Sequence, residues 1–323
     1  MDAHAEPGLS IVVPIHNEEE CIAELGRRLI EVVDGLPETA EFVLVDDGST
    51  DDSPALIREL AAADPRFRFL QLSRSFGHQI ALTAGLEAAR GRAVLTMDGD
   101  LQHPPEYIPA FLDRWRDGYD VVYGVMQERV VPTRFKSWSA KAFYRILRSM
   151  TDVTVAPAAG DFRLVDRRAL DEFLRLREHH RYLRGMFSWL GYRQIGVDYA
   201  SPARFGGESK YTLWMMIGLA ADALLSFSKS PLRFVIKVAF GVALLSLLFA
   251  AGSVLSKLFG VYNAPGYVSI VAVMVLLGAM QLIVLGVMGE YLERIFDEVK
   301  GRPLYLVADA SDGPLRAPPR RSG

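Results

Sequence analysis

Two aspartates separated by one glycine follow an apolar stretch at residues 92–97, in the segment MDGDLQHPPE. Asp98 and Asp100 can converge on one hard cation if the backbone turns between them, and Gly99 permits such a turn. Gln102 adds an amide oxygen. Oxygen ligands suit Mg²⁺ or Mn²⁺, and Mg²⁺ is commonly held by one or two carboxylates together with substrate phosphates. The motif therefore indicates a metal that links the protein to a diphosphate, although a solvated Asp-Gly-Asp turn would look the same.

Two further polar motifs favour a phosphorylated ligand. Asp46 and Asp47 end the apolar stretch 41–47, where a carboxylate can accept N–H groups from a nucleobase. Uracil and guanine both offer such donors, and DDGST is equally good turn chemistry. GGESKY places Lys210 in a glycine-rich loop, where it is a candidate cation for a diphosphate. The plain alternative is a flexible surface loop.

These side chains need a scaffold that gathers them. Strand-like stretches at 9–15, 41–47, 66–72 and 92–97 alternate with helix-like stretches at 18–34, 53–63 and 79–89. This alternation predicts an α/β domain with a mainly parallel sheet covered on both faces. Ligands bind beyond the carboxyl ends of the strands in such sheets. Residues 14–18, 46–47 and 98–100 all follow strands, so they are expected to share one edge. Pro104 and Pro105 hold the next backbone extended until a helix begins.

The bulk composition points to a membrane protein in a reducing compartment. The chain has 323 residues, a formal net charge of −3 and a mean hydropathy of +0.15. Its single cysteine, Cys21, excludes an internal disulfide framework. The first residues have no basic segment or apolar core, so no signal peptide is expected. The histidines have no zinc-binding spacing and are interpreted as non-ligands.

Two charge-poor stretches near the C-terminus predict a transmembrane hairpin. They lie near 234–259 and 267–288, and about 20 apolar residues cross the hydrocarbon layer. The alternative is a buried helical hairpin in a soluble core. Basic residues lie outside the pair, and only Lys257 lies near the connecting loop, so both termini are expected in the cytoplasm.

A basic stretch upstream predicts helices on the membrane surface. Residues 129–148 contain six Lys or Arg and no acid. Aromatic and aliphatic residues recur there at helical spacing, which is typical of an amphipathic helix at a bilayer, here over about 132–150. Residues 211–227 form a second, more apolar candidate. Either segment could equally be an ordinary helix packed on the protein. Arg134 is the candidate for binding an anionic group of a lipid.

Five motifs occur in order: VVPIHNEE (12–19), VDDGSTDDS (45–53), MDGDLQHPPE (97–106), GDFRLVDR (160–167) and GESKY (207–211). Together they resemble the family 2 GT-A glycosyltransferases. The resemblance is to the dolichyl-phosphate mannose synthase-like group, in its bacterial form with two C-terminal membrane helices, and it covers residues from about 9 to 302. Gly99 departs from it, since many relatives have alanine there.

The resemblance implies a division of the chain into three parts. A Rossmann-like GT-A domain would occupy residues 1–228 and include the membrane-surface helices. Two transmembrane helices would lie within 229–300, and 301–323 would be a partly disordered cytoplasmic tail.

The resemblance also implies an activity. The enzyme would be an inverting glycosyltransferase that moves one sugar from a UDP- or GDP-sugar to undecaprenyl or decaprenyl phosphate at the cytoplasmic leaflet of the inner or plasma membrane. It implies Mg²⁺ or Mn²⁺ as cofactor and no nucleic-acid partner, and it leaves a homo-oligomer open. Carried over by position, the residues fall into three sets: Pro14, Asn17, Glu18, Asp46, Asp98 and Lys210 for the nucleotide sugar; Asp98, Asp100 and Gln102 for the metal; Asp161, Arg163, Lys210 and Arg134 for catalysis.

The chemistry of the acceptor limits what Asp161 needs to do. A phosphate monoester has a second pKa of about 6, so it is largely dianionic at neutral pH and needs little deprotonation before attack. Asp161 is therefore expected to orient rather than to act as a strong base, through a neighbouring cation such as Arg163. A structural ion pair between the two is the plain alternative.

Two rival functions share parts of this pattern. A processive polysaccharide synthase of the same fold would carry a Gln-x-x-Arg-Trp motif and many more membrane spans, and the sequence has no such motif. A non-catalytic, membrane-tethered scaffold that binds nucleotide sugars would not need Asp98, Asp100, Gln102 and Lys210 together.

Overall fold

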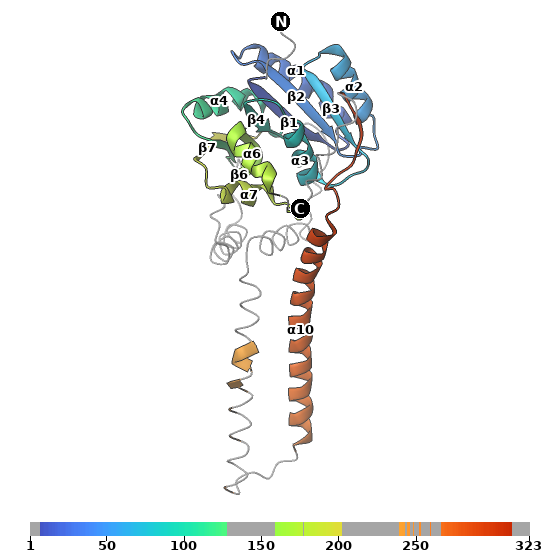
Figure 1. The fold of residues 1–323 in the computed structure, drawn as a ribbon, viewed down its shortest axis with the longest axis vertical. Coiled ribbons are helices and arrows are strands. Elements are labelled where there is room, and N and C mark those ends of the chain that lie inside the picture. Colours follow the sequence, from blue (N-terminus) through green and yellow to red (C-terminus); the bar gives the residue numbers. More distant parts are fainter. Residues whose placement is uncertain are drawn as a thin grey trace.

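The structure is a computed structural model that describes residues 7–127, 159–176, 178–201 and 266–311, with a few positions between 239 and 259 (Figure 1). The predicted surface helices at 132–150 and 211–227 lie outside the described residues. So do Arg134 and Lys210, so their roles stay predictions.

An eight-stranded sheet forms the centre of the N-terminal domain. Its strands are β1 (Leu9–Ile15), β2 (Ala40–Asp46), β3 (Phe67–Leu72), β4 (Ala93–Thr96), β5 (Val121–Met126), β6 (Ala159–Asp166), β7 (Gln194–Tyr199) and β8 (Val307–Ala310). Their spatial order is β7-β5-β6-β4-β1-β2-β3-β8. The β1–β2, β1–β4, β2–β3 and β5–β7 pairs are parallel, and β6 and β8 pair antiparallel with their neighbours. The predicted α/β fold with a mainly parallel sheet is confirmed.

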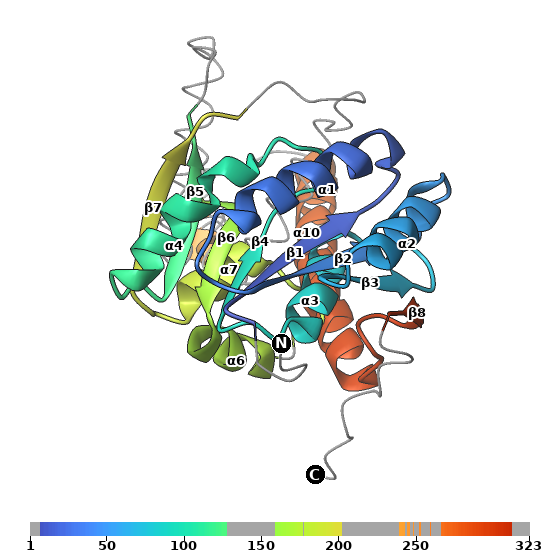
Figure 2. The same cartoon turned by 90° about the horizontal axis from the view of Figure 1, so that it is seen from above.

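Helices cover both faces of this sheet, as Figure 2 shows. The helices are α1 (Glu19–Asp34), α2 (Ser53–Ala63), α3 (His78–Ala88), α4 (Ile108–Arg116), α6 (Arg167–Arg175) and α7 (Leu183–Trp189). Consecutive strand residues point to opposite faces. Ile11 accordingly belongs to one buried cluster with residues of α1, α2 and α4, and Val12 to another with residues of α3, α6 and α7.

The backbone turns at Gly99 and Asp100, directly after β4, as expected. Gly99 does not have positive φ, but a Cβ there would lie 2.6 Å from Ile15 Cδ1, so the close approach of β1 favours glycine. The next residue, Leu101, has a left-handed φ of 62°. Pro104 is extended, with φ −70° and ψ 123°, and a 3₁₀ turn over Pro105–Tyr107 leads into α4, as the proline pair predicts.

The segment after residue 300 completes the sheet. β8 runs antiparallel to β3. The Tyr305 hydroxyl donates a 2.6 Å hydrogen bond to Glu87, and Arg58 lies 3.2 Å from Asp309. This strand was not predicted, because four residues beside a Pro- and Arg-rich end carry little periodicity.

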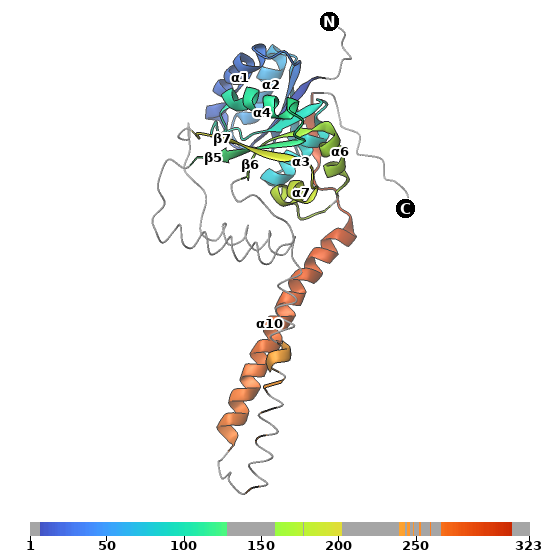
Figure 3. The same ribbon diagram turned by 90° about the vertical axis from the view of Figure 1, so that its left-hand side faces the viewer.

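A single long helix, α10 (Tyr267–Lys300), precedes β8 and extends away from the sheet (Figures 1 and 3). It is 34 residues long, about twelve residues longer than predicted at its C-terminal end. Within its stretch Leu276–Lys300, a window of 18 residues has a mean hydropathy of 1.4, and none of that window is buried within the protein. The alternative of a helix buried in a soluble core is therefore wrong for α10.

The predicted transmembrane hairpin is not confirmed. Within the described parts of the chain, α10 is the one helix long and apolar enough to cross a membrane. The first predicted span, 234–259, contains only isolated described positions, some of them helical, and the large apolar side chains described there, such as Phe240 and Leu244, are exposed.

Candidate active site

The site begins where two neighbouring strands meet at one edge of the sheet. β6 runs antiparallel to β4, with Arg163 opposite Thr96. The start of β6 therefore lies beside the residues that follow β4. The Thr96 hydroxyl donates a 2.5 Å hydrogen bond to the backbone oxygen of Asp161 and locks this register. As a result, Asp161 is brought to the edge at which Asp98 and Asp100 follow β4.

Arg184 is the principal partner of Asp161. Its Nε donates a hydrogen bond of 3.1 Å to Oδ1, and its Nη2 donates one of 2.9 Å to Oδ2. Burial works to raise the pKa of Asp161, but His78 and Arg184 outweigh it and hold this pKa far below its usual range. The same pairing outweighs burial at Arg184 and raises the pKa of its guanidinium. The pair is therefore fully charged at neutral pH.

His78, the first residue of α3, lies between the two acidic positions. Its Nε2 is 3.4 Å from Asp98 Oδ1 and 3.6 Å from Asp161 Oδ2. Burial works to lower the pKa of His78, but the interactions with Asp161 and Asp98 prevail and raise it. From the sequence, this histidine was interpreted as a non-ligand and had no predicted role. Its position at the start of a helix that follows a strand was the signal available.

Gln79 connects this cluster to α7. Its side-chain oxygen accepts a 3.1 Å hydrogen bond from the backbone N–H of Leu183, and its Nε2 lies 3.4 Å from Asp161 Oδ2. Leu183 directly precedes Arg184. Gln79 therefore fixes the start of α7 relative to the carboxylate that Arg184 binds. Gln79 and Arg184 were not predicted as site residues because they lie 82 and 23 residues away from Asp161 in the sequence.

The predicted partnership of Arg163 with Asp161 is wrong. Asp161 forms its described ion pairs with Arg184 and His78. The Arg163 guanidinium instead lies 4.6 Å from the centre of the Phe187 ring, and only 3% of the residue is exposed. Burial, partly opposed by the charge of Asp161, lowers the pKa of Arg163 to about 10. Arg163 therefore packs against Phe187 of α7. Its side chain is too buried to contact a ligand.

The Asp-Gly-Asp segment is held by its own loop. The backbone N–H of Asp98 donates a 2.9 Å hydrogen bond to Nδ1 of His103, whose ring stacks on Phe162. Asp100 Oδ1 accepts a 3.1 Å hydrogen bond from the backbone N–H of Gln102. Because Nδ1 of His103 is an acceptor here, its 3.4 Å contact with Asp98 Oδ2 is not a hydrogen bond.

The carboxylates of this segment fit a divalent cation. Asp98 Oδ1 is buried and has no hydrogen-bond donor among the described residues. Within the described ranges, no three His, Cys, Asp or Glu side chains gather closely enough to hold a metal by themselves. Mg²⁺ commonly takes only one or two carboxylates and completes its octahedron with water and substrate phosphates. Asp98, Asp100 and the side-chain oxygen of Gln102 therefore suit an ion that arrives with its diphosphate.

Asp46 and Asp47, at the end of β2, differ in their hydrogen bonds. The Asp47 carboxylate accepts hydrogen bonds from the backbone N–H groups of Phe76 and Gly77 at 2.7 and 3.0 Å, and from the Ser75 hydroxyl at 2.9 Å. Asp46 Oδ1 accepts one from the Ser49 N–H, while its buried Oδ2 has no partner in the described part of the chain. Asp47 is thus structural, and Asp46 retains an acceptor for a ligand.

The segment after β1 shapes the same edge. The Asn17 side-chain oxygen accepts a 2.8 Å hydrogen bond from the backbone N–H of Thr50, and Asn17 has a left-handed φ of 56°. The Glu18 backbone N–H donates to the Ser53 hydroxyl, and Pro14 is buried. The structure thus places the predicted nucleotide residues beside the loop after β2, where Asn17 holds that loop in shape.

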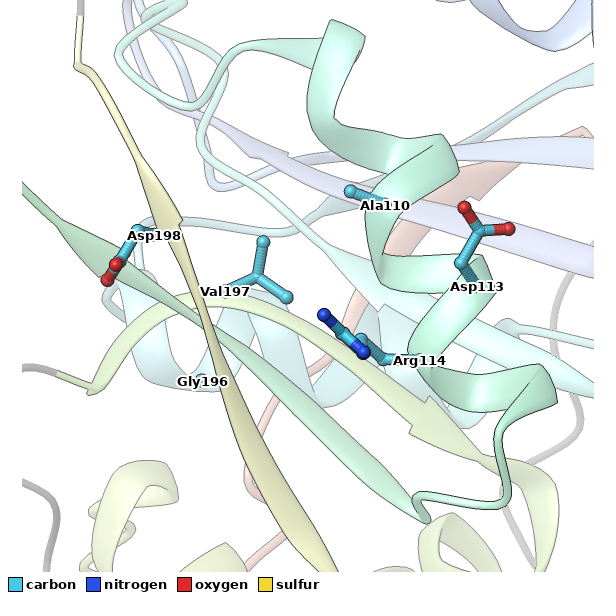
Figure 4. A pocket seen from close by; sticks show the side chains of 6 residues that line it. All are labelled: Ala110, Asp113, Arg114, Gly196, Val197 and Asp198. Carbon is cyan, nitrogen blue, oxygen red and sulfur yellow. The ribbon is translucent and has the colours of Figure 1, made fainter.

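The cavity shown in Figure 4 lies elsewhere. It has a volume of about 430 Å³ between α4 and β7 and is lined by Ala110, Asp113, Arg114, Gly196, Val197 and Asp198. None of the predicted site residues lines it.

An α/β domain whose mostly parallel sheet carries an acidic motif beyond one carboxyl edge has the GT-A-like arrangement. The chain belongs to glycosyl transferase family 2, whose family model matches residues 10–174. It is therefore an enzyme, a glycosyltransferase.

Relatives match over nearly the full length. The uncharacterized glycosyltransferase YkcC of Bacillus subtilis is 42% identical over 92% of this chain and 92% of that protein. The uncharacterized glycosyltransferase sll0501 of Synechocystis is 41% identical over 93% and 95%. The SfII prophage-derived bactoprenol glucosyl transferase of Shigella flexneri is 35% identical over 94% of this chain and 99% of that protein.

Proposed function

We propose that this enzyme transfers one sugar from a nucleotide diphosphate sugar to a polyprenyl phosphate at a membrane surface. The observation that carries the proposal is the edge shared by Asp98, Asp161 and Arg184 in a chain that also has an exposed apolar helix of spanning length. Support comes from the bactoprenol glucosyl transferases, whose matches cover 94% and 93% of this chain.

The donor nucleotide binds along the carboxyl ends of β1 and β2 in this proposal. Asp46 offers its unpartnered Oδ2 to an N–H group of the base, and Pro14, Asn17 and Glu18 line the pocket. Both uracil and guanine present such a donor, so UDP- and GDP-sugars remain the two candidate donors.

The diphosphate lies beyond β4, where Asp98, Asp100 and Gln102 would hold Mg²⁺ or Mn²⁺. When bound, such an ion stabilises the negative charge that develops on a departing diphosphate. Lys210 keeps its predicted role as an additional cation for the diphosphate.

Arg184 is the cation that we assign to the acceptor phosphate. Two of the five guanidinium N–H groups bind Asp161, which leaves three for another anion. Asp161 keeps the guanidinium in place, and its lowered pKa makes it a weak base. A dianionic phosphate needs no strong base, so the oxygen can attack the anomeric carbon directly and invert it. Arg134 stays a second candidate for the acceptor.

The test is product formation by purified protein in detergent. It is supplied with Mg²⁺ or Mn²⁺, undecaprenyl phosphate and one radiolabelled UDP- or GDP-sugar at a time. A lipid that carries one sugar through a monophosphate supports the proposal. A growing glycan, or label transferred only to water, contradicts it. α10 as a membrane span, with the catalytic domain on the cytoplasmic side, is tested separately by protease protection in sealed vesicles.

A further inference from the structure

α10 contacts the catalytic domain at the residues that lead into α7. The backbone N–H of His179 donates a 2.6 Å hydrogen bond to Glu298 Oε1. One residue later, the Nε2 of His180 lies 3.3 Å from Asp297 Oδ2. The last turns of α10 therefore contact residues 179–180 through a hydrogen bond to the backbone and a contact between side chains.

The same short segment ends in the active site. Arg181 Nη2 donates a 2.5 Å hydrogen bond to the backbone oxygen of Leu176 and closes the segment on itself. The Leu183 N–H then binds Gln79, and Arg184 binds Asp161. Arg184, whose guanidinium binds Asp161, thus follows the α10 contact at His179 by five positions in the chain.

The composition of α10 indicates that segment 179–184 lies near the membrane surface, where a lipid acceptor would bind. Residues 267–289 carry no charge, and the charged residues of α10 begin at Glu290. From Gly289 to Glu298 the helix rises about 13 Å, at about 1.5 Å per residue. A lipid phosphate is confined to the membrane surface. The segment 179–184 is thus anchored close above the level at which an acceptor phosphate arrives.

We propose that Glu298 is a positioning residue for Arg184. By fixing His179, it sets the entry into α7 so that Arg184 presents its remaining N–H groups to the acceptor phosphate. The helix with membrane-spanning composition thereby holds the acceptor site as well as anchoring the enzyme. This inference rests on the proposed function, because it assigns the acceptor to the Arg184 side.

Three variants of the full-length protein separate this role from a general effect of charge. Glu298→Ala removes the acceptor of the His179 hydrogen bond. Glu298→Gln keeps an oxygen in the same place and removes the charge. Glu293→Ala is the matched control, an exposed acid on the same helix with no described hydrogen bond or ion pair.

We expect Glu298→Ala to raise the acceptor KM at least fivefold with the donor KM unchanged, and Glu298→Gln and Glu293→Ala to stay within twofold of wild type. Hydrogen–deuterium exchange gives a second readout, in which only Glu298→Ala should speed exchange of peptides that cover 178–184. An acceptor KM for Glu298→Ala equal to that of Glu293→Ala, or equal rises of both KM values, overturns the inference. If wild type makes no sugar-linked lipid, the proposed function fails and this inference falls with it.

Discussion

Arg184 binds both carboxylate oxygens of Asp161 through Nε and Nη2, at 3.1 and 2.9 Å, although the two residues belong to different elements. Asp161 lies in β6 and Arg184 in α7. Bidentate pairing fixes the plane of the guanidinium as well as its position. The pair is neutral overall and forms one rigid surface near Asp98, in which Asp161 fixes the Arg184 guanidinium.

Replacing Arg184 tests the geometry of that surface. Lysine keeps the charge but cannot bind two oxygens in a fork. We expect Arg184→Lys to lower kcat/KM for the acceptor by about 10- to 100-fold, which corresponds to about 1.4 to 2.8 kcal/mol. Steady-state kinetics with the acceptor and the donor varied in turn measures this. Arg175→Lys, an exposed change in α6, is the control. An equal fall in kcat/KM for the acceptor and for the donor would argue against an acceptor role for Arg184.

The low pKa of Asp161 predicts how stability depends on pH. A carboxyl whose folded pKa lies below its unfolded value of about 3.9 contributes stability above that value and loses it as pH falls through the folded pKa. The part that depends on protonated His78, whose pKa Asp161 raises, is full below about pH 6.5 and is lost as pH rises through the folded pKa of His78. We expect the Tm difference between wild type and Asp161→Asn to be larger at pH 5.5 than at pH 8, and to shrink below about pH 4. Thermal unfolding in detergent across this range measures it. If the Tm difference between the two proteins has already disappeared when the pH is lowered to 6, the pKa of Asp161 is not low.

Metal removal tests the Asp-Gly-Asp site. We expect EDTA-treated protein to lose at least about 100-fold in kcat, because the charge on the departing diphosphate is then uncompensated. Mg²⁺ or Mn²⁺ should restore the rate. Asp100→Asn should lower the rate similarly and respond little to added metal, with an unchanged Tm in metal-free buffer. Full activity of the EDTA-treated protein would remove the metal from the mechanism.

Two glycines provide a matched stability experiment at the site's rim. Gly48 has φ +64°, and a Cβ there would lie 2.5 Å from the backbone of Arg74 and Ser75. Gly77 has φ +100°, and a Cβ there would meet nothing within 4 Å. Alanine at Gly48 incurs left-handed strain of roughly 1–2 kcal/mol and adds a backbone collision that costs roughly 1–3 kcal/mol. Gly77, at φ 100° and ψ 153°, lies in a region open almost only to glycine, where the strain alone costs roughly 1–3 kcal/mol. We expect Gly48→Ala to destabilise the protein more than Gly77→Ala. Urea unfolding in detergent compares them, and equal losses would contradict the collision.

The sequence predicted most of the N-terminal fold correctly for a simple reason. β1, β2, β3 and β4 and the helices between them form from local periodicity, and parallel order brings their carboxyl ends to one edge. The position of Asp46, Asp98 and Asp100 at that edge was therefore predicted from the chain alone, and their roles in binding stay predictions. The apolar composition of α10 was equally plain, although its charged last turns hid its full length.

Other features depended on contacts between distant residues. β8 is too short to carry a pattern and is stabilised by pairing with β3. The choice of Arg184 over Arg163 as the partner of Asp161 depended on how α7 packs on β6. Arg163 is two residues from Asp161 in sequence, yet the Phe187 ring takes its guanidinium.

The sequence by itself determined the class of enzyme, the acidic edge of the sheet and the apolar C-terminal helix, because each is written in residues that are neighbours along the chain. Only the tertiary structure decided that β6 returns antiparallel beside β4, that α3 and α7 converge on Asp161, and that the end of α10 contacts the segment leading into α7. The reason is physical: a hydrogen bond or ion pair depends on distance in space, and chain folding brings together residues that no local pattern connects.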